Sequence, residues 1–262
     1  MMIGFIGGGN MAEAIIKGIT HRYAGNIIVS EPRDERRAYL EKTYNINTTP
    51  RNRDVASSAN IIILAVKPQE MGNVLEEISD VIPEEKTVVS IAAGITLSYL
   101  STRLKTRKIV RIMPNTPALI QEGMSVVSMC ECINEKDIEV IRDIFMSVGR
   151  LLTLPEKYMD AVTALSGSGP AFIAYFVEAM IEGGVGRGLS EDNANALVVQ
   201  TLLGTARLLD TGMKPSKLRE MVTSPKGTTA AGLAMFEEKG LKEIVVAAIA
   251  AATERAKELG KS

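Results

Sequence analysis

The chain has 262 residues, of which 46% are apolar and 23% are charged, and its formal net charge is -1. This composition is typical of a soluble globular protein, and its length suits one large domain or two ordinary ones. The nearly balanced charge gives no electrostatic footprint for nucleic acid or for an anionic membrane, so we expect neither as a partner.

Three further features exclude other classes of protein. His21 is the only histidine, and one lone C-x-C is not a zinc site, so we expect no metal site. The two cysteines, Cys130 and Cys132, are also too close together to form a disulfide framework. The start of the chain lacks the basic segment and cleavage site of a signal peptide. The longest uncharged run, Ala161–Val177, falls short of a membrane span and contains Ser-Gly-Ser-Gly-Pro. A cytoplasmic protein is therefore expected.

The N-terminal half alternates apolar runs with helical patterns. Strands are predicted at Met2–Ile6, Ile27–Ser30, Ile61–Val66, Thr87–Ile91, Ile109–Met113, Met124–Met129 and Leu151–Leu154. Helices are predicted from Asn10, over Arg33–Tyr44, from Met71, near Leu97–Leu104 and over Glu135–Val148. This order predicts an α/β fold with a Rossmann-like, doubly wound and mostly parallel sheet, which the last two strands extend at one edge.

The turn after the first strand fits the pattern G-x-G-x-x-A, directly before a helix. Gly7 permits the tight turn, Gly9 lets the backbone approach a pyrophosphate, and Ala12 packs the helix on the strand. A dinucleotide is therefore expected to contact Gly7, Gly8, Gly9, Asn10, Met11 and Ala12. Ala65, Val66, Lys67 and Pro68 end a central strand, at the edge where such ligands lie. A solvated charge is an equally good interpretation of Lys67.

The end of the second strand carries opposing signals about the type of cofactor. Glu31 could accept from a ribose 2′-OH and favour NAD, whereas arginine and serine accommodate a 2′-phosphate and favour NADP. We expect Ser30 and Arg33 to contact the cofactor and NADPH to be preferred over NADH. Arg36 and Arg37 follow one turn later, and an exposed helix face is the alternative interpretation for both.

No strand pattern follows Pro155, so the sequence predicts a dinucleotide-binding domain over residues 1–154 and a helical domain over residues 155–262. Helices are predicted at Ala161–Ile181, Asp192–Leu209, Lys217–Val222, Ala230–Lys239 and Leu241–Leu259. The stretch Phe172–Ile181 is apolar on nearly every face. A helix buried all round needs cover on every side, so we expect helices of a partner chain around it.

The stretch Thr223–Gly232 has the features of an anion-binding loop. Pro225 and Gly227 break any helix, and Thr228 or Thr229 is predicted to cap the next one. A helix start surrounded by hydroxyls suits a small anion, most simply a carboxylate. The loop has no acid, histidine or cysteine, which favours binding over acid–base chemistry. Taken alone, an ordinary capped turn is the commoner interpretation.

Several motifs together resemble pyrroline-5-carboxylate reductase, in the family's order and over nearly the whole chain. They are Gly7–Ala12, Ala65–Gln69, Arg111–Pro117, Ala164–Ala171 and Thr223–Thr229. The resemblance implies reduction of a cyclic imine acid to L-proline with NAD(P)H, in the last step of proline biosynthesis. It also implies interlocked helical domains in a homodimer, with a decamer of five dimers as a larger assembly.

The resemblance also implies roles for single residues. Ser224, Gly227, Thr228 and Thr229 would hold the substrate carboxylate, and Thr229 aligns with the family threonine that contacts the ring nitrogen. Asn115, Pro117 and Ser166 would border the nicotinamide. The family usually has glycine where this chain has Lys226.

Two alternatives remain open at this point. A β-hydroxyacid dehydrogenase has a similar layout, but it would need a lysine on the helix after Pro170, and Ala171–Ile181 carries none. A cofactor-binding regulatory protein without turnover is the alternative from another class. The intact hydroxyl loop disfavours it, and an assay with pyrroline-5-carboxylate would decide.

Overall fold

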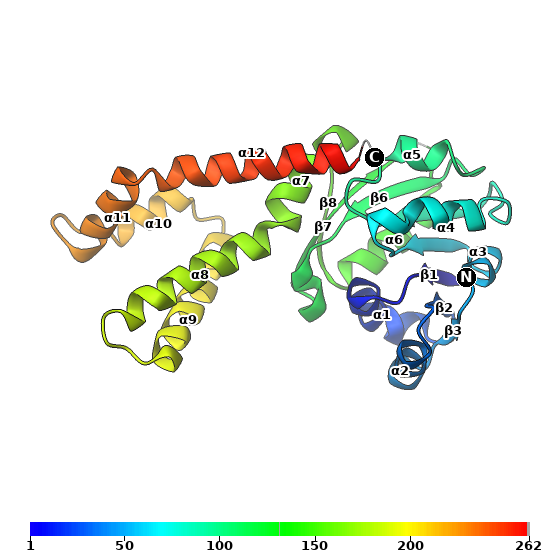
Figure 1. Ribbon diagram of the computed structural model, residues 1–262, viewed down its shortest axis with the longest axis horizontal. Coiled ribbons are helices and arrows are strands. Elements are labelled where there is room, and N and C mark those ends of the chain that lie inside the picture. The colour runs from blue at the N-terminus through cyan, green and yellow to red at the C-terminus, as the bar shows by residue number, and fades with distance from the viewer. Residues whose placement is uncertain (131, 261–262) are drawn as a thin grey trace. The chain divides into compact units, whose positions relative to one another are not determined.

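The computed structural model describes residues 1–130 and 132–260 and shows two compact units (Figure 1). The first unit comprises Met1–Ser168 and the end of the last helix from Ala251 onward, and the second comprises Gly169–Ala250. The units therefore part within the helical half, some residues beyond the end of the last strand. The predicted domain boundary after residue 154 stays a prediction.

The first unit is built on one eight-stranded sheet in the order β3-β2-β1-β4-β5-β6-β7-β8. The strands are β1 (Ile3–Ile6), β2 (Ile27–Ser30), β3 (Asn47–Thr49), β4 (Ile61–Leu64), β5 (Thr87–Ser90), β6 (Ile109–Met113), β7 (Gly123–Met129) and β8 (Gly149–Thr153). All neighbours pair in parallel except β6 and β7, which are antiparallel. The mostly parallel sheet, with β7 and β8 at one edge, confirms the predicted fold class.

One strand and one helix were not predicted. β3 has three residues, Asn-Thr-Thr, and the following α3 (Asn52–Ser58) has seven, of which only Val55 and Ala56 are buried. A strand without an apolar residue and a helix with a short apolar stripe give almost no hydrophobic periodicity. Pairing with β2 supplies what the local sequence lacks, since Ile28, Val29 and Ser30 align with β3.

Helices cover both faces of the sheet (Figure 1). On one face α1 (Asn10–Tyr23), α2 (Asp34–Tyr44) and α6 (Glu135–Met146) pack over strand residues such as Phe5 and Ile63. On the other face α3, α4 (Met71–Ile78) and α5 (Leu97–Ser101) pack over residues such as Ile6 and Ile62. Successive strand residues face opposite layers, so both faces need apolar side chains, and these strands are continuous apolar runs.

Helices account for the rest of the chain, and residues 155–260 contain no strand, as predicted. The α-helices are α7 (Met159–Val162), α8 (Gly169–Val185), α9 (Glu191–Asp210), α10 (Pro215–Met221), α11 (Thr228–Glu238) and α12 (Leu241–Leu259). Short 3₁₀ turns lie at Pro68–Glu70, Thr116–Ile120 and Glu156–Tyr158. A π-helical turn at Thr163–Gly167 joins α7 to α8, within the stretch Ala161–Ile181 that the sequence predicts as a helix.

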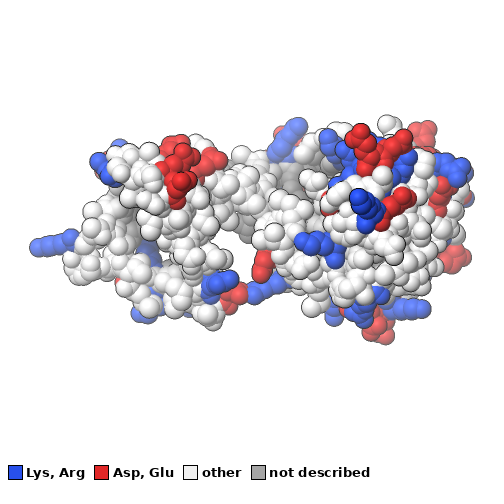
Figure 2. Space-filling model, turned by 90° about the horizontal axis from the view of Figure 1, so that it is seen from below, with Lys and Arg blue, Asp and Glu red and all other residues white. Residues whose placement is uncertain are grey.

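The second unit leaves large apolar side chains exposed. Phe172 is 39% exposed, Tyr175 77% and Leu197 57%. Figure 2 shows broad uncharged areas over these helices, toward the left of the view, and more closely spaced charges over the sheet unit. Of the residues that the structure describes, Glu156–Val185 is the one helical stretch long and apolar enough to cross a membrane by length and composition.

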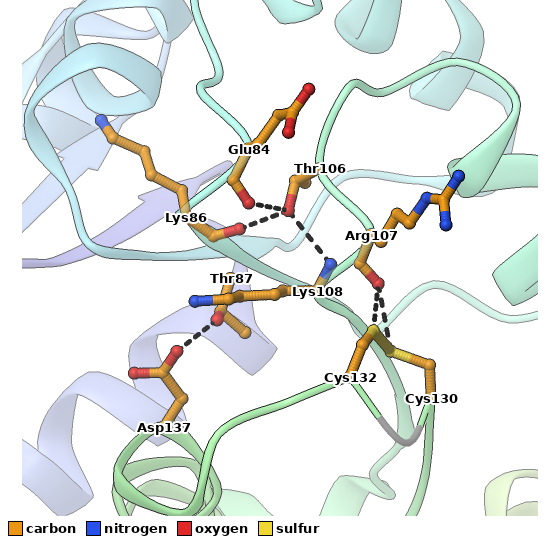
Figure 3. Close-up of a disulfide and its surroundings, with 9 residues drawn as sticks. All are labelled: Glu84, Lys86, Thr87, Thr106, Arg107, Lys108, Cys130, Cys132 and Asp137. Atoms are coloured by element: carbon orange, nitrogen blue, oxygen red, sulfur yellow. Dashed lines mark hydrogen bonds between the residues drawn. A yellow bond between two sulfur atoms is a disulfide. The ribbon is translucent and has the colours of Figure 1, made fainter.

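Cys130 and Cys132 form a disulfide with each other at the end of β7 (Figure 3). Both sulfur atoms lie close to the carbonyl oxygen of Arg107, at 3.0 and 2.9 Å. The bond closes a local loop and joins no distant segments, so the fold depends on its core and not on a disulfide framework.

Candidate functional site

The glycine-rich turn between β1 and α1 forms an open backbone cradle. Gly7 has φ +98°, a left-handed conformation, and a Cβ atom there would lie 2.8 Å from the carbonyl oxygen of Ala65. Gly9 is the N-cap of α1 without a side-chain hydrogen bond, and a Cβ on it would meet no atom within 4 Å. Free N–H groups at a helix start, with space above them, suit a pyrophosphate.

The turn opens into a pocket of about 380 Å³ at the carboxyl ends of the strands. Strand order reverses between β1 and β4, and ligands of open α/β sheets lie at such a switch point. The pocket is lined by Gly9, Asn10, Met11, Ala65, Val66, Lys67, Pro68, Ile91, Ala92, Ala93, Met113, Pro114, Asn115, Thr116 and Gly167. Predicted residues from three separate motifs therefore meet in one pocket.

Asn115 joins two walls of this pocket. Its Nδ2 donates to the carbonyl oxygen and the hydroxyl of Ser166, both at 3.3 Å, and its Oδ1 accepts from the Met124 N–H at 2.8 Å. Ser166 lies in the π-helical turn, and a Cβ on the neighbouring Gly167 would come within 2.5 Å of Met113. The asparagine thus fixes the distance between the end of β6 and the π-helical turn.

The buried guanidinium of Arg111 lies near the same wall of the pocket. Arg111 on β6 is almost fully buried, and its guanidinium lies 3.3 Å from Glu156 and 3.4 Å from Asp160. Glu156 also accepts from the Leu97 N–H at 2.7 Å. A buried guanidinium needs such partners, and removing one acid would leave an uncompensated charge. The pairs hold the start of the helical segment against the sheet within the first unit.

The end of β2 presents a carboxylate to the glycine turn. Glu31 Oε2 accepts from the Gly8 N–H at 3.2 Å, and Oε1 accepts from Arg33 Nε at 2.7 Å. Burial by itself would raise the pKa of Glu31, but the hydrogen bonds from Arg33 and Gly8 outweigh it and hold this pKa below its ordinary value. The group is therefore an anion at neutral pH.

Three other polar side chains near this strand end have partners within the fold. Ser30 is buried, and its hydroxyl donates to Asn52 Oδ1 at 2.8 Å and lies 3.4 Å from the Phe5 carbonyl oxygen. Arg36 Nε donates to the Gly8 carbonyl oxygen at 2.7 Å. Arg37 donates to the carbonyl oxygens of Glu31 and Pro32, at 2.7 and 2.9 Å.

Arg36 belongs to a hydrogen-bonded cluster that contacts the glycine turn. Glu13 on α1 accepts from Arg36 at 2.5 Å and from the hydroxyls of Tyr39 and Tyr44 at 2.8 Å each. Burial and the hydrogen bond to Glu13 raise the pKa of Tyr44 above its ordinary value, so this hydroxyl remains a donor. Gly8 is consequently held at both ends of its backbone, its N–H by Glu31 and its carbonyl by Arg36.

The hydroxyl-rich loop of the second unit differs from expectation at the helix start. Neither Thr228 nor Thr229 is the cap: Gly227 is the N-cap of α11, without a side-chain hydrogen bond. The reason is a turn from Ser224 to Gly227, closed by a 3.0 Å backbone bond, with Lys226 in the left-handed region at φ 60°. The turn brings the chain into the helix one residue early, so both threonines lie in the first helical turn.

This correction leaves the loop well suited to an anion. The first N–H groups of α11 have no carbonyl partner within the helix, and no side chain caps them. A Cβ at Gly227 would lie 2.3 Å from the Ser224 hydroxyl oxygen, so a larger residue there would displace this hydroxyl. Thr223 does not join the group, because its hydroxyl donates to the Arg219 carbonyl oxygen at 2.6 Å.

Some pocket residues were missed in the sequence. Ile91, Ala92 and Ala93 line the pocket directly after β5. Their position was available as a signal, because they follow a strand next to β4 on the carboxyl edge. Pro117 and Ser166 are not among the lining residues, although each adjoins one that is. The contacts of each residue with a bound ligand stay predictions.

Comparison with known proteins agrees with both halves of the chain. Residues 156–259 match the family described as pyrroline-5-carboxylate reductase dimerisation, and residues 2–94 match NADP oxidoreductase, coenzyme F420-dependent. The chain is 40% identical to pyrroline-5-carboxylate reductase of Synechocystis sp., covering 100% of this chain and 99% of that one. Identity to the Methanosarcina acetivorans protein of the same name is 41%, with 99% and 98% covered.

Solved structures give the same result. A pyrroline-5-carboxylate reductase from Coxiella burnetii superposes with a TM-score of 0.91 at 36% identity, covering 99% of this chain and 98% of that one. The Plasmodium falciparum pyrroline carboxylate reductase, solved with NADP bound, gives 0.89 at 33%, with the same coverage. With full-length identity of this size, an NAD(P)-binding sheet unit and a matching helical segment, the chain belongs to the pyrroline-5-carboxylate reductase family.

Proposed function

We propose that this protein reduces the C=N bond of 1-pyrroline-5-carboxylate with NAD(P)H and so produces L-proline. One observation carries the proposal within the family: the chain combines a dinucleotide pocket with an uncapped, hydroxyl-bearing helix start that has no acid–base side chain. The substrate offers one carboxylate and one C=N bond. A carboxylate needs donors and a positive helix end, and both are present at the start of α11.

The sheet unit fits NAD(P)H by its own geometry. The left-handed Gly7, the open space above Gly9 and the uncapped α1 form a cradle for the pyrophosphate. When bound, the nicotinamide supplies the hydride that the C=N carbon receives. The protein orients the ring and excludes water, and Asn115 contributes by fixing the π-helical turn beside the pocket.

The hydroxyl loop is proposed to bind and orient the imine acid. Ser224, the Gly227 turn and the first N–H groups of α11 hold the carboxylate. Thr229 donates or accepts a hydrogen bond at the ring nitrogen, which takes up a proton readily without a strong protein acid. Thr228 is exposed and offers a further hydroxyl at the helix start. Each role depends on position rather than on a shifted pKa.

We further propose that two copies associate through their helical units as a cytoplasmic homodimer, with a decamer of five dimers as the larger assembly. The exposed apolar side chains of α8, α9 and α12 support this, because a helix with apolar residues all round needs cover. By the same argument, we propose that another protein chain, and not a membrane, covers the apolar stretch Glu156–Val185.

The direct test is NAD(P)H oxidation by the purified protein with 1-pyrroline-5-carboxylate, together with chemical measurement of proline. We expect one proline for each NAD(P)H oxidised. A β-hydroxyacid substrate with NAD(P)⁺ is the matched control, and turnover of that substrate alone would support a β-hydroxyacid dehydrogenase instead. Cofactor binding with no turnover of either substrate would support a regulatory protein.

A further inference from the structure

The carboxylate at the end of β2 lies in the position where Rossmann-like folds recognise the adenosine ribose of a dinucleotide. We propose that Glu31 accepts from the ribose hydroxyls and discriminates against a 2′-phosphate, so that this enzyme binds NADH more tightly than NADPH. The inference rests on the proposed use of NAD(P)H and goes beyond it by assigning the choice between the two cofactors to one residue.

The direction of the Glu31 side chain is the first observation. The sequence left open whether this carboxylate turns toward the ribose or away from it. In the structure only 6% of the side chain is exposed, and its Oε2 accepts from the N–H of Gly8, the middle residue of the glycine turn. The carboxylate is thus fixed at the turn where the pyrophosphate and its ribose are expected.

The arginines give the second observation. Three of them suggested a 2′-phosphate site, but Arg36 is held by the Gly8 carbonyl and Glu13, and Arg37 by two carbonyl oxygens and Asp34. Only 18% and 17% of these two side chains is exposed. Arg33, at 69%, remains the accessible one of the three, and its Nε already donates to Glu31.

Charge then decides between the cofactors. A 2′-phosphate beside Glu31 would place two anions close together. The accessible guanidinium, that of Arg33, would have to give up its bond to Glu31 in order to bind the phosphate. A 2′-hydroxyl makes no such demand, since it donates to the carboxylate while Arg33 stays in place. Ser30 offers no compensation, because its hydroxyl is buried and donates to Asn52.

The test measures binding without turnover. Dissociation constants for NADH and NADPH are determined by fluorescence titration of the full-length protein, in the wild type and in Glu31→Gln and Arg33→Gln. Glutamine keeps an acceptor for the Gly8 N–H, and thermal unfolding checks that each variant folds. Glu35→Gln is the matched control, because it removes the same charge from an exposed residue in the first turn of α2, the helix that follows Glu31.

The two variants should move the ratio of dissociation constants in opposite directions. We expect Glu31→Gln to shift it about tenfold toward NADPH, the size of one charge-assisted hydrogen bond. Arg33→Gln should weaken NADPH and leave NADH nearly unchanged, and Glu35→Gln should leave the ratio unchanged. A wild type that binds NADPH more tightly, or an unchanged ratio in a folded Glu31→Gln protein, would overturn the inference. Proline formation is scored separately, so failure here would leave the proposed reaction intact.

Discussion

The sheet unit and the helical unit treat their apolar residues in opposite ways. Phe5, Ile63 and Phe145 in the sheet unit are completely buried, whereas α8, α10 and α11 contain no buried residue. Burial of apolar surface is the main favourable contribution to folding. The first unit therefore finds its stability within one chain. The second leaves much of its apolar surface exposed, and we propose that another copy covers it.

The largest expected effect comes from separating the two regions. Residues 155–262 alone should fail to form a folded monomer, because the helices expose apolar side chains on nearly every face. Circular dichroism with light scattering would show an unfolded or associated fragment. Residues 1–168 are the matched control. They keep the sheet, with Glu156 and Asp160 for Arg111, lack only the end of α12 from the first unit, and should form a folded monomer. A helical, monodisperse monomer of residues 155–262 would contradict the claim that the helical unit needs a partner chain.

Two phenylalanine substitutions, one in each unit, should have different effects. Phe145→Ala should lower the free energy of unfolding by about 3–5 kcal/mol, because it leaves a cavity in a closed core. Phe172→Ala, on a side chain that is 39% exposed, should instead weaken association of the chains. Denaturant unfolding at several protein concentrations separates the two effects. Equal, concentration-independent losses would contradict the distinction.

Loss of one hydroxyl should affect turnover and not cofactor binding. Thr229→Ala removes the hydroxyl proposed to bond the ring nitrogen and should lower kcat/KM for pyrroline-5-carboxylate by the equivalent of about 1–3 kcal/mol. The dissociation constant of NAD(P)H should stay the same, because the dinucleotide pocket belongs to the other unit. Unchanged kcat/KM would exclude Thr229 from the site.

The smallest expected effect concerns the loop before α11. Lys226 has φ 60°, a conformation that costs a residue with a Cβ about 1–2 kcal/mol and glycine nothing. Because glycine is also more flexible in the unfolded chain, Lys226→Gly should raise stability by only about 0.5 kcal/mol. Lys239→Gly, at φ -87°, is the control and should lower stability. A loss of stability in Lys226→Gly would show that the lysine side chain makes a contact that stabilises the fold by more than the left-handed conformation costs.

Much of this architecture could be predicted because it rests on strong local patterns. The buried strands are continuous apolar runs, and the G-x-G-x-x-A turn stands between a strand and a helix, so element order and pocket position followed. The polar β3 and α3 could not be predicted, since their stability comes from packing on β2. The predicted cap of α11 was wrong, because a sequence pattern does not show that Lys226 adopts a left-handed conformation.

Side-chain direction was the other limit. Three arginines after β2 favoured a phosphate site, but a sequence does not show that Arg36 and Arg37 bind backbone carbonyls within the fold. Nor does it show that Glu31 turns toward Gly8. The sequence shows which charged residues follow β2, but only the structure shows which of them are free to contact a cofactor.

The mass of the full-length chain in solution shows whether the helical units associate. It is followed by light scattering during dilution while activity per chain is recorded. We expect a mass of at least twice the 28.2 kDa of one chain wherever the protein is active. Activity should fall as the assembly dissociates, because the helical unit then loses its cover. A fully active, stably folded monomer of 28.2 kDa would contradict the account.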